Sequence, residues 1–192
     1  MSNRGSILII CSGNVCRSPY LCHLLTRVVD QAWGSGAMPV TCAGLEGLTG
    51  AAMESRSAAA LAERGVDATG FVAQRITAGL VDEAALVLTM TRRQRSALLK
   101  SWPAAMKRSF TVADFVHLGG FVGDAQLPTR TAPDGWVREV ADLVNGQRGM
   151  HAPLSPEEAD IADPFGRDDA VHEAMVTRID DFMPGLSRLL GA

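Results

Sequence analysis

The stretch Ser6 to Pro19, SILIICSGNVCRSP, decides the fold. It opens on a short apolar run rich in β-branched side chains, which predicts a buried strand over Ser6 to Cys11. Ser18-Pro19 then supplies an N-cap hydroxyl and a proline for the first helical position, and apolar residues recur at helical spacing as far as Gly34. The sequence therefore predicts a strand that turns through a short loop into a helix, whose N-terminus faces that loop.

The rest of the chain repeats this alternation. Further strands are predicted at Val40 to Ala43, Leu86 to Met90 and Phe110 to Ala113. Further helices are predicted at Glu54 to Arg64, from about Thr91, and at Asp169 to Leu190, the last interrupted by Pro184-Gly185. The pattern indicates an α/β fold, an open parallel sheet of four strands flanked by helices on both faces.

Composition limits the domain organisation and the partners. A chain of 192 residues that is 47% hydrophobic encloses one core, so we interpret residues 1–192 as a single domain. Residues 117–161, rich in Gly, Pro and Asp, are interpreted as an insertion or long loop with a short helix at Trp136 to Val144. The net charge of −3 argues against a nucleic-acid partner.

No apolar run approaches the roughly 20 residues that span a bilayer, so the chain is not expected to cross a membrane. The short run Ile7 to Cys11, followed by polar residues, also lacks the apolar core of a secretory signal. We therefore expect a cytoplasmic protein. In that compartment its four cysteines do not form a disulfide framework, and they show no zinc-binding spacing.

Residues 11–18, here called the cysteine loop, follow the first strand at the sheet edge where open α/β folds place ligands. Gly13 and Asn14 are able to take positive φ and turn backbone N–H groups inward, and the following helix directs its positive end at the same point. Arg17 adds a planar fork of donors. Together with Ser12, Val15 and Cys16, these residues form a site suited to a tetrahedral dianion.

The same surroundings favour the thiolate form of Cys11, so its pKa is expected to fall and the sulfur to act as a nucleophile. The alternative is that Cys11 is only a small apolar residue that closes a buried strand. Ser18 has two compatible roles, to cap the helix and to donate a hydrogen bond to the departing thiolate.

The string Ile7 to Pro19 resembles the phosphate-binding loop of the low-molecular-weight protein tyrosine phosphatases, C-x-G-N-x-C-R-S-P after a hydrophobic strand. The likeness extends to Val40 to Gly44, Glu54 to Val66, Val81 to Thr91 and Asp163 to Gly166. It implies a four-stranded parallel sheet with a phosphate-binding loop after the first strand. It also implies hydrolysis of phosphate monoesters through a phosphocysteine, without a metal or cofactor.

The resemblance places a general acid and base at Asp163, in ADPFG. Taken alone, that stretch reads as an ordinary Asp-Pro turn. Asp160, Asp168 and Asp169 are nearby competitors for the role. Phe165 falls where the family has an aromatic wall for the substrate, although it is equally suited to anchor its loop.

Two apolar residues complete the expected substrate contacts. Leu48 falls near the opposite wall, and Val15 stands where related arginine phosphatases carry a Thr that hydrogen-bonds a guanidinium. Val15 therefore favours phosphotyrosine over phosphoarginine.

Other cysteines and several departures from the family pattern affect the surroundings of the loop. The resemblance implies that Cys16 forms a reversible disulfide with Cys11, whereas Cys22 is interpreted as a packing residue. Cys42 replaces a Ser that supports the loop asparagine, Phe71 replaces a supporting His, and Thr91 replaces an Asp. These changes bear on the turnover rate and the rigidity of the loop.

The remaining polar residues receive no catalytic role. Arg92, Arg93 and Arg95 are interpreted as a solvated helix face, with the alternative that they attract acidic segments of a substrate. No function is assigned to the histidines, which are His23, His117, His151 and His172. We therefore expect a phosphatase that acts on tyrosine-phosphorylated proteins. The alternatives are a thiol-dependent arsenate reductase and a catalytically weak phosphoprotein-binding module.

Overall fold

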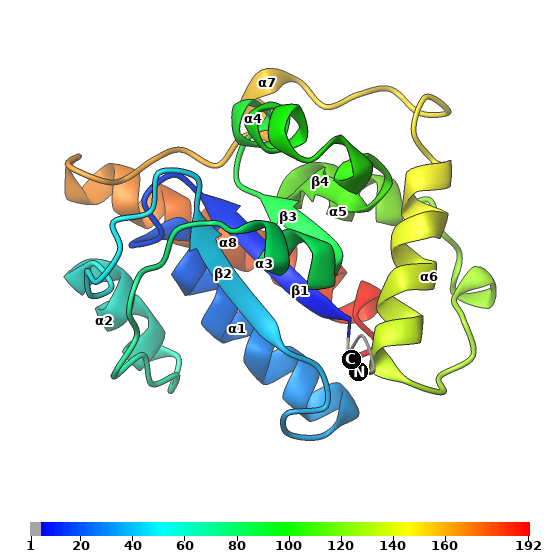
Figure 1. Ribbon diagram of the computed structural model, residues 1–192, viewed down its shortest axis with the longest axis horizontal. Coiled ribbons are helices and arrows are strands. Elements are labelled where there is room, and N and C mark those ends of the chain that lie inside the picture. Colours follow the sequence, from blue (N-terminus) through cyan, green and yellow to red (C-terminus); the bar gives the residue numbers. More distant parts are fainter. Residues whose placement is uncertain (1–4) are drawn as a thin grey trace.

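The computed structural model describes residues 5–192 and contains an open parallel sheet of four strands in the order β2-β1-β3-β4. The strands are β1 (Ser6–Cys11), β2 (Val40–Gly44), β3 (Ala84–Thr89) and β4 (Ser109–Thr111). β1 lies between β2 and β3, paired in parallel with both (Figure 1). The predicted α/β fold with an open four-stranded parallel sheet is confirmed.

Helices cover both faces of the sheet, and alternate residues of β1 face the two layers. Ile7 and Ile9 belong to the larger core, to which α1 (Arg17–Trp33), α5 (Val112–Gly119) and α8 (Asp169–Leu189) contribute buried side chains. Leu8 and Ile10 belong to the smaller core, formed with α3 (Ala78–Glu83), α4 (Arg92–Ser101) and the 3-10 helix η1 (Pro103–Arg108). Because β1 is buried on both faces, its sequence is continuously apolar rather than alternating.

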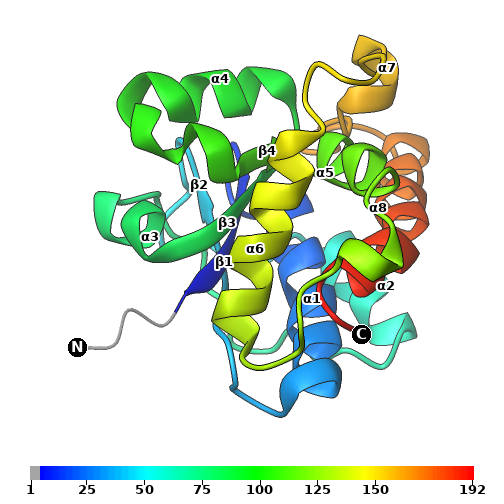
Figure 2. The ribbon, with the colours of Figure 1, turned by 90° about the vertical axis from the view of Figure 1, so that its right-hand side faces the viewer.

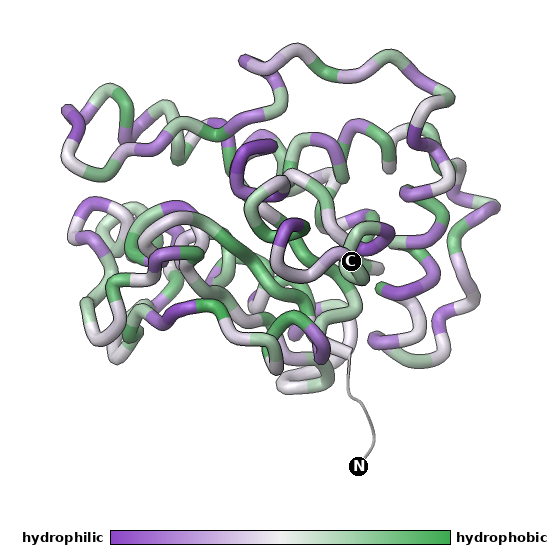
Figure 3. The backbone as a smooth tube through the Cα atoms, turned by 45° about the horizontal axis from the view of Figure 1, so that its top comes forward, coloured by the Kyte–Doolittle hydropathy of each residue, from purple (hydrophilic) through white to green (hydrophobic). Residues whose placement is uncertain are grey.

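The remaining helices are α2 (Ser55–Glu63), η2 (Asp124–Gln126), α6 (Pro133–Gly146) and α7 (Pro156–Ala159). α6 packs against β3, α5 and η1, and Figure 2 shows it in front of the sheet. In Figure 3 the most hydrophobic stretches follow the strands through the interior, while the hydrophilic ones lie on outer helices and loops. Within residues 5–192, no helix has both the length and the apolar character needed to cross a membrane.

Residues 117–161, expected as an insertion or long loop, hold a longer helix than the predicted Trp136 to Val144. α6 extends over Pro133–Gly146, and its apolar face joins the larger core through Trp136, Val140 and Val144. Trp136 also donates its indole N–H to the carbonyl of Leu189, at 3.0 Å. This segment therefore supplies part of the main core rather than only connecting other elements.

Several predicted element boundaries are wrong: β3, for example, spans Ala84–Thr89 rather than Leu86 to Met90. Two further errors have a clear physical reason. β4 ends at Thr111 rather than Ala113, because the Thr111 hydroxyl accepts from the N–H of Asp114 and caps α5. Pro184 and Gly185 do not interrupt the last helix. Beyond them Leu186 and Leu189 are buried in the core, and this packing holds the final turns despite the backbone hydrogen bond that proline lacks.

Gly185 has a specific packing role. A Cβ there would lie 2.6 Å from Cγ1 of Val116, so only glycine allows α8 to approach α5 this closely.

Candidate active site

The cysteine loop connects the end of β1 to the start of α1, and Asn14 is the only non-glycine residue of the described chain with positive φ, at 60°. The prediction of positive φ is thus confirmed for Asn14, whereas Gly13 does not adopt it. With this conformation the backbone N–H of Asn14 donates to Cys11 Sγ over 3.2 Å. The loop therefore curls around the sulfur.

Cys11 is almost fully buried, and its Sγ lies 2.9 Å from the hydroxyl oxygen of Ser18. Burial raises the pKa of the Cys11 thiol, whereas the hydrogen bonds from Ser18 and Asn14 and the charge of Arg17 lower it. Burial has the larger effect, so the net direction is upward. The expected fall in pKa is therefore wrong, because the burial of the sulfur away from water is not visible in the sequence.

Ser18 does not cap α1. The helix begins at Arg17, its N-cap is Cys16, and no side chain caps it. The Ser18 hydroxyl instead faces Cys11 and also accepts a hydrogen bond from Nδ2 of Asn14, at 2.9 Å. The predicted capping role is wrong, and the predicted contact with the sulfur is present.

Arg17 and Asp163, 146 positions apart in the chain, form an ion pair through Nη2 of the arginine. The Arg17 side chain is buried, whereas that of Asp163 is 48% exposed. Nη1 of Arg17 donates to the carbonyl of Ile161 at 3.1 Å. Its Nε is buried without a hydrogen-bond partner among the described residues, so the guanidinium keeps one donor for a ligand.

A cavity of about 170 Å³ opens above Cys11. Arg17 and Asp163 line it, and Leu48 and Phe165 are exposed at 44% and 57%, as expected of residues at its mouth. The other lining residues are Ser12, Gly13, Val15, Cys16 and Glu46. Of these, sequence reasoning missed Glu46. Asn14 and Ser18 are fully buried and act from behind the loop.

The segment between β2 and α2 lies alongside the cysteine loop and is joined to it by backbone hydrogen bonds. Leu48 donates to the carbonyl of Gly13 at 2.9 Å, and Glu54 donates to that of Val15 at 2.8 Å. The Glu54 carboxylate also accepts from the backbone N–H of Arg56 and Ser57, at the start of α2. Burial raises the pKa of Glu54, but the hydrogen bonds from the Arg56 guanidinium and from the backbone N–H of Ser57 outweigh it and hold the pKa below its usual range.

Two glutamines that sequence reasoning missed support the loop. The backbone N–H of Gln74 donates to Oδ1 of Asn14 over 2.9 Å. The buried side chain of Gln94 donates to the Ser12 hydroxyl and accepts from the N–H of Met90, both at 3.1 Å. The Thr91-x-x-Gln94 spacing, which is typical of a capping box, signals a helix start at Thr91 but not the contact of Gln94 with the cysteine loop.

The departures from the family pattern are accommodated in different ways. Thr91 caps α4, where its hydroxyl accepts from the N–H of Gln94. Phe71 packs against Val15 and Cys16, and Cys42 is buried in β2 opposite Ile9. Cys22 is buried in the larger core, as predicted.

All four cysteines are free thiols. For Cys16, burial raises the pKa to about 12, assisted by the nearby charge of Glu54.

The three competing aspartates are engaged elsewhere. Asp160 accepts from the N–H of Arg92 at 2.8 Å, Asp168 caps α8, and Asp169 pairs with Arg56 at 2.9 Å. Among the described residues, no histidine lines the cavity above Cys11.

The expected solvated arginine face is only partly correct. Arg92 pairs with Asp114 at 3.2 Å, and Arg95 donates to the carbonyl of Ser109 at 2.7 Å, so both are half-buried. Arg93 alone of the three is exposed.

Comparisons with known proteins agree with this fold. The family model described as low molecular weight phosphotyrosine protein phosphatase matches residues 6–147. The chain therefore belongs to this family, and it is a phosphatase, a hydrolase of phosphate esters. Asp163 lies beyond the matched residues, so its place in the site depends on the geometry described above.

Individual relatives cover different shares of the chain. It is 24% identical to a low molecular weight protein-tyrosine-phosphatase of Acinetobacter johnsonii, over 70% of this chain and 97% of that protein. It is 31% identical to a protein-arginine-phosphatase of Geobacillus stearothermophilus, over 64% of this chain and 77% of that protein. A crystal structure of a YwlE mutant from Bacillus subtilis has the same fold, with a TM-score of 0.68 and 19% identity over 98% of this chain and 99% of that one.

Proposed function

We propose that the protein hydrolyses phosphotyrosine in proteins through a phosphocysteine on Cys11, with Asp163 as general acid and base. The observation that carries this proposal is the convergence of three groups on one cavity. Sγ of Cys11 forms its base, the Arg17 guanidinium keeps an unpartnered buried donor, and Asp163 lies at its exposed side. This is the set of groups that phosphate transfer to a thiolate needs.

Before the first step the Cys11 thiol, whose pKa burial raises, loses its proton, and Asp163, released from Arg17 by the bound phosphate, gains one. The Cys11 thiolate then attacks phosphorus, and the bond from phosphorus to the tyrosine oxygen breaks. Arg17 and the N–H groups of the cysteine loop hold the equatorial oxygens, where the negative charge is spread. Asp163 gives its proton to the leaving phenolate. A phosphate that binds the guanidinium competes with Asp163 for its donors, so substrate binding loosens the ion pair and leaves the carboxyl beside the leaving oxygen.

In the second step Asp163 takes a proton from water, which attacks phosphorus and breaks the bond to sulfur. The leaving group is now the Cys11 thiolate. Ser18, whose hydroxyl already lies 2.9 Å from Sγ, donates a hydrogen bond to this anion as it departs. Inorganic phosphate is released, and both residues return to their starting states.

The walls of the cavity favour an aryl ester over a phosphoguanidine. Leu48 and Phe165 present apolar surface at the mouth, and Val15 supplies no hydrogen-bond acceptor from its side chain. A guanidinium that faces Val15 finds no acceptor in that side chain, so this wall of the cavity gives it no hydrogen bond. A phosphotyrosine peptide should therefore be hydrolysed faster than the matched phosphoarginine peptide.

The test is hydrolysis of an aryl phosphate by the purified wild-type protein, Cys11→Ser and Asp163→Asn. We expect no turnover by Cys11→Ser. Asp163→Asn should lose roughly 10²- to 10⁴-fold for a poorly activated leaving group and much less for a strongly activated one, because only the former needs a proton. Asp160→Asn is the matched control and should keep this leaving-group dependence unchanged.

Other outcomes would identify the alternatives. Phosphate binding without any turnover by the wild-type protein would indicate a binding module. Faster consumption of arsenate with a thiol donor than of aryl phosphate would indicate a reductase. A phosphate ester found on a residue other than Cys11 after rapid quenching and mass spectrometry would contradict the proposed nucleophile.

A further inference from the structure

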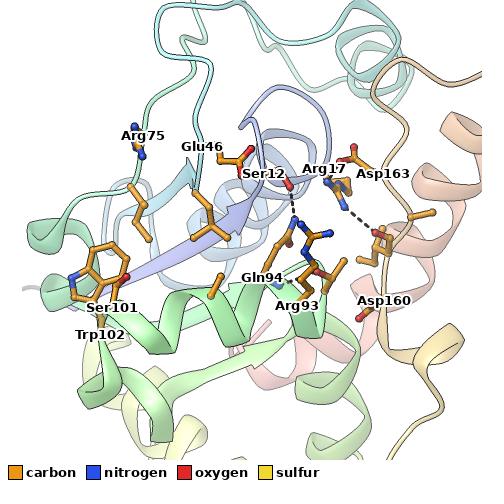
Figure 4. Close-up of a pocket in the computed structure, with 16 residues that line it drawn as sticks. Ser12, Arg17, Glu46, Arg75, Arg93, Gln94, Ser101, Trp102, Asp160 and Asp163 are labelled. Atoms are coloured by element: carbon orange, nitrogen blue, oxygen red, sulfur yellow. Dashed lines mark hydrogen bonds and ion pairs between the residues drawn. The ribbon is translucent and has the colours of Figure 1, made fainter.

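A second, larger groove adjoins the cavity above Cys11. It measures about 680 Å³ and shares Ser12, Arg17, Glu46 and Asp163 with that cavity, so the two form one continuous depression. Figure 4 shows Arg93 and Gln94 at the end of the groove near Ser12, and Trp102 with Ser101 at the other end. The proposed chemistry needs only the smaller cavity.

One wall of this groove is a face of α4. Arg93, Ala97 and Ser101 line it at intervals of four residues, so they lie on one side of the helix. Ala97 and Ser101 are small and leave room above the helix. Trp102, which follows α4 directly, forms the far end.

The dimensions suit an extended peptide. Arg93 and Trp102 are nine positions apart along α4 and its C-cap, which corresponds to about 13 Å at 1.5 Å per residue. An extended chain covers this distance in about four residues. The groove is therefore long enough for the residues that flank a phosphorylated side chain.

The charges along the groove are uneven. Arg93 and Arg75 are exposed, and among residues 5–192 no hydrogen bond or ion pair engages either side chain. The carboxylates of Asp160 and Asp163 are bound to the Arg92 N–H and to Arg17. The Glu46 carboxylate is exposed and lies near Ser12 in Figure 4. Of the two unpaired arginines, Arg93 lies at the end near Ser12, whereas Arg75 lies on the side of Trp102.

Apolar side chains also line the groove, beside Arg75 at the end formed by Trp102. Leu45, Ile76 and Trp102 line the groove and are only half-buried, so they keep surface that an apolar side chain would cover. A ligand that matches the whole groove carries a negative charge close to the phosphate and an apolar group about four residues away.

We infer that this groove binds the segment flanking the phosphotyrosine in the substrate protein, and selects a segment with an acidic residue near the phosphotyrosine and an apolar residue about four positions from it. The acidic side chain pairs with Arg93, and the apolar one packs against Trp102. This inference rests on the proposed function and adds the substrate sequence that the enzyme prefers.

The test compares kcat/KM for an aryl phosphate with that for paired phosphotyrosine peptides that carry Glu or Gln beside the phosphotyrosine. The wild-type protein should prefer the Glu peptide, and the preference should fall as salt screens the charges. In Arg93→Ala the Glu-to-Gln ratio should fall about two- to five-fold, the range for an exposed ion pair. Lys100→Ala, on the same helix but outside the groove, is the matched control.

A second variant tests the shape of the groove. Ala97→Trp should fill it and lower the ratio of peptide to aryl phosphate kcat/KM roughly ten-fold, the loss expected when an apolar side chain cannot be buried. Ser96→Trp places the same bulk outside the groove and should leave that ratio unchanged.

The outcomes separate the two proposals. An absence of aryl phosphate hydrolysis by the wild-type protein would contradict the proposed function. Suppose instead that aryl phosphate hydrolysis is normal, and that neither Arg93→Ala nor Ala97→Trp changes the kcat/KM ratios of the peptides. That result would contradict peptide binding in the groove and leave the proposed function standing. Equal effects from the control variants Lys100→Ala and Ser96→Trp would also overturn peptide binding in the groove.

Discussion

The hydroxyl of Ser18 is the contact whose removal best tests how the site handles the charge on Cys11. Its oxygen lies 2.9 Å from Sγ, and among the groups that lower the pKa of Cys11 it has the largest effect. In Ser18→Ala that stabilisation is lost, so the pKa rises further. A hydrogen bond to a charged group contributes about 1.5–3 kcal/mol, which corresponds to a rise of about one to two pH units.

The hydrogen bond from Ser18 should also stabilise the Cys11 thiolate when it leaves during catalysis. If the thiolate leaves in the second step, Ser18→Ala should lower kcat roughly ten- to hundred-fold, and phosphoenzyme should accumulate in rapid-quench experiments. The pKa is measured separately, from the pH dependence of Cys11 alkylation by iodoacetamide, with mass spectrometry to locate the label. Its profile should move to higher pH than that of the wild-type protein.

Asn14→Gly is the matched control. Glycine adopts positive φ freely and keeps the backbone N–H that bonds to Sγ, but it removes the side chain that donates to Ser18. Its alkylation profile should move less than that of Ser18→Ala. Stabilisation of the Cys11 thiolate by Ser18 is refuted if Ser18→Ala keeps kcat within about two-fold of the wild type and its alkylation profile does not move.

Three further predictions concern the surroundings of the loop. With a pKa of about 12 for Cys16, formation of a Cys11–Cys16 disulfide after peroxide treatment should accelerate about ten-fold per pH unit between pH 7 and 10, and a flat profile would contradict this. Gly44→Ala, whose Cβ would lie 2.4 Å from a backbone oxygen of the loop, should destabilise the protein by about 1–3 kcal/mol in urea unfolding, whereas Gly135→Ala, with open space around its Cβ, should not. Glu54→Ala should lower the free energy of unfolding by about 1 kcal/mol at pH 7 through loss of a helix cap. Because the folded-state pKa of Glu54 is below its usual value, that difference should shrink as the pH falls below about 4, and a constant difference would exclude this cause.

The strands were predictable because local sequence determines them. β1 and β3 are short, continuously apolar runs bounded by polar residues, and such runs form the central strands of parallel sheets. The boundaries that failed depend on contacts with distant residues. Whether the chain continues as a helix past Pro184 is decided by the burial of Leu186 and Leu189, which local propensity does not contain.

In the site, too, the features set by local sequence were predictable and those set by distant contacts were not. The cysteine loop was predictable because its nucleophile, turn residues and arginine lie within eight consecutive positions of the sequence. The roles of Gln94 and Gln74 were not predictable, because each depends on a single hydrogen bond to a loop residue at least 60 positions away. The direction of the Cys11 pKa was missed for a related reason, because burial is a property of the assembled fold.

The contact between Arg17 and Asp163 explains why the topology matters to the chemistry. β1 occupies an inner position in the sheet, so the loop that follows it is reached both by the segment after β2, which brings Leu48, and by the segment before α8, which brings Asp163. The buried guanidinium binds the second segment at the Ile161 carbonyl and at the Asp163 carboxylate. One residue of the loop therefore holds the group proposed as the acid, and a phosphate bound by that same residue would change how firmly the acid is held.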